Sequence, residues 1–231
     1  MHISLALDNN AGLSKFTPKK ISGLLAWYDP SDLSSVTKDG SNLVSQISDK
    51  SGNGIQLAQP TALNKPVWQS DGSILFDGVN SYLRNTTANI PQPFTILLVY
   101  KNVTWASGRG ILTGDATNLC GVRQQGSPPN EHKFMAPTLV GDNASMALNT
   151  YEILTMQFNG ASSSFQFNNK TATTGNPGAN GLGALVIGAR GDYSSKSNMQ
   201  LKGLAIYSGA LASGDITKLK NYFIKKYSLT F

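Results

Sequence analysis

Ala184-Leu185-Val186-Ile187-Gly188 is the first of three consecutive segments that decide the fold. It is a short apolar run bounded by glycines, which is typical of a strand buried on both faces. Residues 201–207 form a second run of this kind. The period then changes, because the next apolar positions recur every three or four residues: Ile216, Leu219, Phe223 and Tyr227. This spacing places them on one stripe of an α-helix, so the three segments predict a strand, a second strand and a helix.

The predicted helix also carries its end signals. Ser213 is the predicted N-cap, and Asp215 lies in the first turn, where the helix dipole favours an anion. Lys225 and Lys226 lie in the last turn, where a cation is favoured. No other segment shows this pattern, and a lone amphipathic helix in a strand-rich chain must lay its apolar stripe on a β-sheet. We therefore expect one helix that covers a sheet.

Two upstream segments extend the strand pattern: residues 74–83 and residues 94–100. Together with the C-terminal segments, they resemble laminin G-like, concanavalin A-like sandwich domains over residues 21–231. The resemblance implies an all-β fold, namely an antiparallel two-sheet jelly-roll sandwich of the concanavalin A-like type with one C-terminal α-helix. We accordingly divide the chain into an N-terminal arm, residues 1–20, and one sandwich domain, residues 21–231. A single domain also agrees with the length of 231 residues and the hydrophobic content of 40%.

Several strands of the sandwich can be placed by their composition. The strongest candidates for central strands are residues 94–100 and 151–158, which are apolar on both faces. The opening strand is predicted at residues 24–28, and the turn Asp29-Pro30-Ser31-Asp32 follows it. Residues 42–48 are predicted as the second strand.

Two later stretches have the composition of turns and loops. Residues 165–167 are predicted as one arm of a hairpin, with Asn168 and Asn169 in its turn, because asparagine tolerates the left-handed conformation that such turns need. Residues 104–149 are rich in glycine and predict short strands between long loops, with no assignable register.

The opening of the sandwich has a further resemblance. Its tryptophan-bearing strand, the turn of residues 29–32 and the loop of residues 49–54 are similar to the openings of sandwich domains in tailed-phage structural proteins and bacterial surface proteins. The short arm in front of the sandwich favours the phage version. The resemblance therefore implies a virion as the location, with other virion proteins and further copies of the chain as partners.

The arm itself has a short apolar alternation at Ile3, Leu5 and Leu7, and it carries Phe16 nearer the sandwich. An extended piece with this alternation has one apolar face, which can add a strand to a neighbouring subunit. A frayed terminus is the alternative interpretation. We predict that these four side chains attach the protein to its partners while the sandwich faces outward.

Charge and hydropathy exclude several classes of partner. The net charge of +6 comes from few charges, since only 14% of the residues are charged. The densest basic group is interpreted as the solvated outer side of the helix: Lys218, Lys220, Lys225 and Lys226. We therefore expect no nucleic acid as a partner. No stretch approaches the roughly 20 apolar residues of a membrane span, and the start lacks the pattern of a signal peptide, so we expect no membrane partner and synthesis in a host cytoplasm.

The residues that a hydrolase needs are scarce. Sandwich glucanases carry an E-x-D-x-x-E strand, because a retaining mechanism needs two carboxyl groups about 5–5.5 Å apart. The chain has only Glu131 and Glu152, and neither has that pattern around it. A Ser-His-Asp triad would have to use His132, which lies in a surface loop by composition. Cys120, the only cysteine, has the neighbours of a buried small hydrophobe, so we expect no enzymatic activity and no catalytic residue.

Calcium is the one metal that the sequence leaves to consider. One cysteine and two histidines cannot form a four-ligand structural zinc site without carboxylates. Laminin G-like domains, which the chain resembles, often bind calcium on loop oxygens, and Asp115, Asp142 and Asp192 are loop aspartates that could contribute. Turn-forming aspartate without an ion is the interpretation that we favour, so we predict no metal and no cofactor.

Exposed aromatic rings beside amides and charges are typical of sugar-binding surfaces. Trp105 lies close to glycines and to Arg109, while Arg190, Asp192 and Tyr193 share one predicted loop. These five residues form the predicted glycan site.

The leading hypothesis for function is a non-catalytic structural or adhesion protein of a phage virion. It would serve as a capsid decoration or as a tail or fibre accessory, attached by its arm and exposing a sandwich for host-surface polysaccharide. One alternative is a stand-alone carbohydrate-binding module of a bacterial surface protein. A more remote alternative is a polysaccharide hydrolase.

Overall fold

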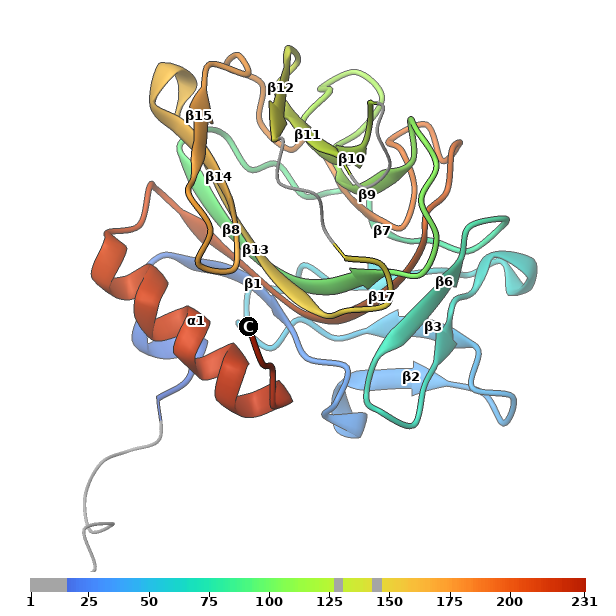
Figure 1. The fold of residues 1–231 in the computed structure, drawn as a ribbon. Helices are drawn as coiled ribbons and strands as arrows, with labels where there is room; N and C mark the ends of the chain where they lie inside the picture. Colours follow the sequence, from blue (N-terminus) through green and yellow to red (C-terminus); the bar gives the residue numbers. More distant parts are fainter. Residues whose placement is uncertain (1–15, 127–130, 143–146) are drawn as a thin grey trace, which may run out of the picture.

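The computed structural model describes residues 16–126, 131–142 and 147–231. Two antiparallel β-sheets lie face to face, and one α-helix lies against the outer face of the first sheet (Figure 1). The predicted all-β sandwich with a C-terminal helix is therefore confirmed. The predicted arm residues Ile3, Leu5 and Leu7 lie outside the described residues.

The first sheet has eight strands, with β8 near its centre. In spatial order it runs β15 (Thr173–Gly175), β14 (Ser163–Phe167), β13 (Glu152–Phe158), β8 (Phe94–Asn102), β17 (Asn198–Ser208), β6 (Ile74–Asp77) and β5 (Val67–Trp68), and β1 (Leu24–Tyr28) also pairs with β17. Ile96 and Leu98 of β8 face the space between the sheets, whereas Leu97 and Val99 face the helix. Burial of both faces explains the continuous apolar run that predicted this strand.

The second sheet has nine short strands. In spatial order it runs β12 (Leu139–Asp142), β11 (His132–Met135), β10 (Gly121–Gln124), β9 (Gly110–Thr113), β16 (Leu185–Ile187), β7 (Leu83–Asn85), β4 (Leu57–Ala58), β3 (Val44–Ile47) and β2 (Val36–Lys38). The strand expected second in the chain is the third, since β2 precedes it. Short 3-10 turns complete the described elements: η1 (Pro18–Lys20), η2 (Leu33–Ser35), η3 (Ala62–Asn64) and η4 (Gly160–Ser162).

Aromatic side chains fill much of the space between the sheets. Phe134 of the second sheet stacks on Phe165 of the first with ring centroids 5.3 Å apart, and it meets Phe158 edge to face at 5.9 Å. All three side chains are fully buried. Burial of each is worth about 1.5–3 kcal/mol, so contacts of this kind hold the two layers together.

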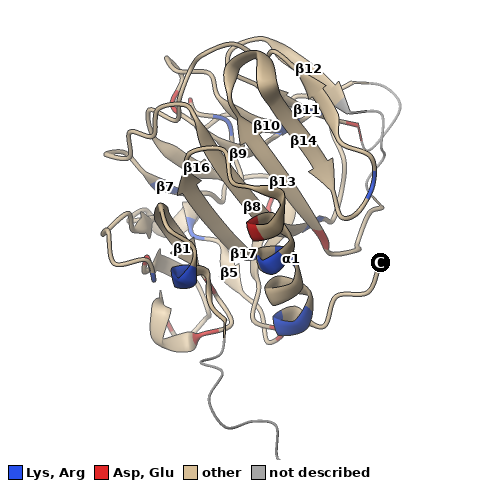
Figure 2. Ribbon diagram, turned by 90° about the vertical axis from the view of Figure 1, so that its left-hand side faces the viewer, with Lys and Arg blue, Asp and Glu red and all other residues tan. Residues whose placement is uncertain are grey.

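The helix α1 (Ser213–Tyr227) covers the outer face of the first sheet, where Figure 2 shows it lying over β13, β8 and β17. Leu219, Phe223 and Tyr227 are buried in this interface, as their spacing predicted. The predicted N-cap is wrong by one residue, because Ala212 has the extended backbone and its carbonyl accepts the first helical N–H groups.

Lys220 is also placed differently from the prediction. It is buried rather than solvated, and its Nζ donates to the side-chain oxygen of Gln166 and to the carbonyl of Asn168, each at 2.6 Å. Position 220 adjoins the apolar stripe, so the side chain reaches over the hairpin of the first sheet. Burial lowers the pKa of Lys220. Asn168 itself has a φ of 47°, which confirms the predicted left-handed turn.

The beginning of the described chain lies on the helix. The Phe16 ring meets the Tyr222 ring edge to face, with centroids 6.0 Å apart. Pro18 is buried, and its carbonyl accepts a hydrogen bond of 3.0 Å from the hydroxyl of Tyr207. Residues 16–20, which we assigned to the arm, thus contact the sandwich.

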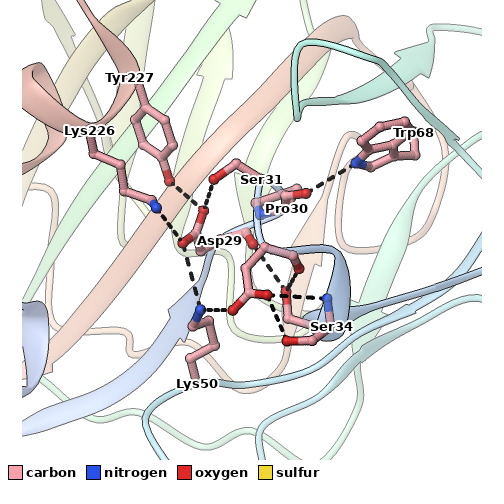
Figure 3. A network of polar contacts seen from close by, with 10 residues as sticks. Asp29, Pro30, Ser31, Ser34, Lys50, Trp68, Lys226 and Tyr227 are labelled. Atoms are coloured by element: carbon pink, nitrogen blue, oxygen red, sulfur yellow. Dashed lines mark hydrogen bonds and ion pairs between the residues drawn. The ribbon is translucent and has the colours of Figure 1, made fainter.

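A polar network ties the first turn to the end of the helix (Figure 3). The Asp29 carboxylate is only 2% exposed and accepts hydrogen bonds from Ser31 Oγ at 2.6 Å and from Tyr227 Oη at 3.1 Å. It also pairs with Lys226 Nζ at 3.0 Å and with Lys50 Nζ at 3.7 Å. The predicted turn after β1 therefore acts as a clamp between β1, the loop after β3 and α1.

Candidate functional site

The loop between β16 and β17, residues 188–197, is held against strand β9 of the second sheet. Thr113 Oγ1 at the end of β9 donates to the carbonyl of Ala189 at 3.0 Å. At the other end of β9, the Gly110 N–H donates to the carbonyl of Ser195 at 3.0 Å, and Ser197 Oγ donates to the carbonyl of Gly110. Contacts at both ends of β9 make this loop a rigid part of the sandwich.

The same loop approaches the β9–β10 loop, residues 114–120, very closely. A Cβ atom at Gly191 would lie 2.3 Å from the carbonyl oxygen of Gly114, so a residue larger than glycine would push the two loops apart. Within the loop, the Tyr193 N–H donates to the Arg190 carbonyl at 2.8 Å, and Tyr193 has a φ of 60°. The tight turn leaves Asp192 exposed and Arg190 and Tyr193 partly buried.

A stack of side chains braces the turn from the side. The Tyr193 ring lies parallel to the Tyr82 ring, with centroids 5.0 Å and an interplanar angle of 14°. The guanidinium carbon of Arg84 lies over the Tyr193 ring at 4.6 Å from its centroid, and Lys196 Nζ donates to the Tyr193 carbonyl at 2.6 Å. Tyr193 is therefore engaged with protein partners and is not a bare platform for a sugar ring.

A small hollow opens between the β16–β17 loop, the β9–β10 loop and β10. Its volume is about 20 Å³, which is room for one small group. It is lined by Thr113, Asp115, Leu119, Cys120, Arg123, Met135, Arg190 and Gly191. We call this feature the arginine hollow.

Two guanidinium groups meet at the arginine hollow. Burial, and secondarily the charge of Arg190, lower the pKa of Arg123. The Nε atom of Arg123 is buried and has no hydrogen-bond partner among the described residues. Cys120 is buried in the main core as predicted, and burial raises the pKa of its thiol, so it contributes an apolar wall.

The arginines of the chain are concentrated in one layer of the sandwich. All four belong to the second sheet or to its loops: Arg84, Arg109, Arg123 and Arg190. Every ion pair between described residues uses a lysine instead. We call the surface formed by Tyr82, Arg84, Arg123, Arg190 and Tyr193 the arginine face.

The structure brings most of the predicted glycan-site residues close together in the fold. Arg190, Asp192 and Tyr193 share the β16–β17 loop, and Arg109 directly precedes Gly110, which is bonded to that loop. Trp105 has a different partner: its Nε1 donates to the Glu131 carbonyl at 3.5 Å, and no hydrogen bond or ring contact between described residues joins it to the loop.

Sequence reasoning missed three residues of the arginine face: Tyr82, Arg84 and Arg123. The first two flank Leu83, which points into the core, and Arg123 follows the core residue Val122. Alternation of a core residue with large polar residues was the available signal, because neighbours in a strand point to opposite faces.

Two of the candidate calcium ligands accept hydrogen bonds within their own turns. Asp115 Oδ1 accepts the backbone N–H groups of Thr117 and Asn118, and Asp192 Oδ1 accepts the N–H and hydroxyl of Ser194. The side chain of Asp142 lies outside the described residues. Among the described residues, no group of three or more His, Cys, Asp or Glu side chains is placed to hold a metal ion.

The residues considered for catalysis lie apart from the arginine face. Glu152 is 5% exposed in β13, and Glu131 pairs with Lys133 at 3.5 Å. The surface position predicted for His132 is wrong: the side chain is fully buried, with Nε2 2.9 Å from Asn102 Nδ2. Pairing of β11 with β10 and β12 turns this side chain into the core.

In the part of the chain that the structure describes, no helix has both the length and the apolar character needed to cross a membrane.

No protein-family description matches the sequence, and no curated protein matches it. Solved structures match it in fold. The binding domain of Paraclostridial Mosquitocidal Protein 1 aligns with a TM-score of 0.63 and 12% identity over 90% of this chain and 53% of that chain. Domain 4 of AbnA, a GH43 extracellular arabinanase from Geobacillus stearothermophilus, in complex with arabinotriose, aligns with a TM-score of 0.57 and 16% identity over 85% of this chain and 98% of that chain.

A sialidase from Trypanosoma rangeli in complex with sialic acid aligns with a TM-score of 0.55 and 14% identity over 87% of this chain. The chain spans 33% of the length of that sialidase and about half of the mosquitocidal protein's binding domain. At these identities the likeness shows the fold alone, which is the antiparallel two-sheet sandwich that the sequence predicted. The resemblance to phage proteins stays a prediction.

Proposed function

We propose that the chain is a non-catalytic carbohydrate-binding sandwich that uses its arginine face. The observation that carries this proposal is the fixed position of the β16–β17 loop. Hydrogen bonds join the loop to both ends of β9, and the ring of Tyr82 stacks on Tyr193 of the loop. Polar side chains on a preorganised loop lose little conformational entropy when they bind, which favours recognition of a polar ligand. Related folds point the same way, since domain 4 of AbnA is in complex with arabinotriose.

Binding without catalysis is part of the proposal. Glu152 is buried in the first sheet, Glu131 pairs with Lys133, and neither has the E-x-D-x-x-E pattern of sandwich glucanases around it. Incubation with each polysaccharide that the protein binds should release no new reducing ends. Release of reducing ends that an Asp→Asn change abolishes would contradict this part.

The test of binding is affinity electrophoresis in gels that contain neutral or acidic polysaccharides. At least one polysaccharide should retard the wild type, and Arg190→Gln should weaken that retardation about tenfold. Lys225→Gln removes the same charge from the exposed side of α1 and is the matched control. The proposal is wrong if no polysaccharide retards the protein, or if the loop variant and the wild type are retarded equally.

We further propose that residues 1–15 attach this sandwich to a virion, among further copies and other virion proteins, for display toward host polysaccharide. Support comes from the alternation of Ile3, Leu5 and Leu7 and from the place where the described chain begins, which is beside α1. Because α1 covers the first sheet and the arginine face belongs to the second, attachment and glycan binding would use opposite sides.

Deletion of residues 1–15 tests the attachment. Phe16 is kept in the deletion variant because it packs on Tyr222. The variant should fold and bind glycan as the full chain does, yet be missing from purified particles. Normal incorporation of the variant into particles would show that the arm is not the attachment device, and absence of the full chain from all particles would favour a bacterial surface protein.

A further inference from the structure

We infer that the arginine hollow binds a carboxylate, so that the glycan recognised by the arginine face is an acidic polysaccharide built from uronic or sialic acid units. This inference rests on the proposed carbohydrate-binding function and names the ligand class of the same site. It begins from the two guanidinium groups of Arg123 and Arg190, which line one hollow of about 20 Å³.

Two like charges that share a small, partly buried hollow repel each other. The effect is visible in Arg123, whose pKa is lowered by burial and by the neighbouring Arg190. An arginine stays charged at neutral pH in proteins, so the repulsion is not relieved by loss of a proton. An anion between the two groups would relieve it.

The carboxylates nearest to the hollow are engaged elsewhere. Asp115 lines it, but Oδ1 accepts two backbone N–H groups of its own loop and Oδ2 accepts Asn118 Nδ2 at 3.4 Å. Asp192, whose pKa is lowered mainly by the Ser194 hydroxyl and partly by Arg190, is exposed and capped on its own turn. The buried Nε of Arg123 is left with no acceptor among the described residues.

The size and shape of the hollow select the ligand group. A space of about 20 Å³ takes one small group and not a sugar ring, so the ring must lie over the rim while a substituent enters. A planar carboxylate matches the paired N–H groups of a guanidinium, and such charge-assisted contacts are stronger than those to a neutral hydroxyl. Gly191 also lines the hollow, and it lies so close to the backbone of residues 114 and 115 that a side chain there would move the loop that carries Arg190.

Matched polymers test the inference directly. The probes are polygalacturonate, alginate, hyaluronan and polysialic acid, each paired with the same polymer after chemical reduction of its carboxyl groups to alcohols, and dextran sulfate. Binding is measured by biolayer interferometry at about 0.15 M NaCl, where distant charges are screened. At least one acidic polymer should bind, and its reduced form should bind about tenfold or more weakly.

Variants connect that preference to the hollow. Arg123→Gln and Arg190→Gln should each weaken binding of the acidic polymer about tenfold, and Arg190→Lys, which keeps the charge and loses the planar fork, should fall between them and the wild type. Lys225→Gln should bind within about twofold of the wild type, because its charge lies on the far side of the sandwich. If Arg123→Gln does not fold, the two Arg190 variants decide the question.

These measurements distinguish failure of carboxylate recognition from failure of carbohydrate binding. Equal binding of an acidic polymer and its reduced form, tighter binding of dextran sulfate than of every carboxylate, or an equal loss in Lys225→Gln would overturn the carboxylate inference and leave carbohydrate binding in place. Binding of no polymer in either form would overturn the carbohydrate-binding function itself, and the inference with it.

Discussion

Replacing Asp29 by asparagine removes the charge at the centre of the clamp and keeps the shape of the side chain. The carboxylate is 2% exposed, so water cannot take over its role. Its oxygens accept from Tyr227 and Ser31, and they pair with Lys226 at 3.0 Å. The amide of asparagine offers one acceptor oxygen, and its NH₂ group would compete with the ammonium of Lys226.

The expected cost follows from these contacts. Hydrogen bonds to a charged group contribute about 1.5–3 kcal/mol each, and loss of one member of a buried ion pair typically costs about 3–5 kcal/mol. The lysine partners limit the loss, because Lys226 is 29% and Lys50 is 22% exposed and both can regain water. We therefore expect Asp29→Asn to lower the free energy of unfolding by about 2–3 kcal/mol.

Urea denaturation followed by tryptophan fluorescence measures this free energy. Asp32→Asn is the matched control: it pairs with the same Lys50, but its side chain is 36% exposed, so its loss should cost at most about 1 kcal/mol. A double-mutant cycle of Asp29→Asn with Lys226→Met should give a coupling of about 1 kcal/mol or more. A cost for Asp29→Asn no larger than that of Asp32→Asn would refute the clamp.

Three further predictions follow from single contacts. A hydrogen bond from Lys50 lowers the pKa of Asp32 to about 2, so the stabilisation that the Asp32 carboxylate contributes is full above its unfolded pKa of about 3.9 and is lost as the pH falls toward 2. The difference in unfolding free energy between wild type and Asp32→Asn should therefore shrink between about pH 4 and about pH 2. A constant difference over this range would contradict the prediction. At Gly203, a Cβ would lie 2.7 Å from Tyr227 Oη, so Gly203→Ala should lower the free energy of unfolding by about 1–3 kcal/mol. Alanine in place of a strand glycine is otherwise favourable, so an unchanged or raised Tm in a thermal melt would argue against that contact. At Gly191, a Cβ would lie 2.3 Å from the backbone carbonyl oxygen of Gly114, so Gly191→Ala should lower the Tm. It should also weaken glycan binding by the protein that remains folded, because the loop that carries Arg190 must move; equal glycan binding would mean that the loop position does not matter.

Local periodicity was sufficient to predict the elements in which nearby residues determine which positions are buried. β8 is apolar at successive positions because the core takes one face and α1 takes the other, and α1 carries its apolar stripe at the spacing of a helix. The turn at Asn168 also follows from a local preference, since asparagine adopts the left-handed conformation at small cost. Each of these features depends on residues within a few positions of one another.

The arginine hollow and the clamp were decided only by tertiary structure. β9 pairs with β10, its neighbour in the chain, and with β16, more than seventy residues later, and this second pairing sets Arg190 beside Arg123. Burial of Lys220 and His132 likewise depends on partners from distant strands. The periodicity of a strand says which residues share a face but not which strand lies alongside, because hydrogen bonding between strands is made by the backbone, which is the same for every pair. Side-chain packing of the whole sandwich selects among those pairings, so this site emerges only when the fold is complete.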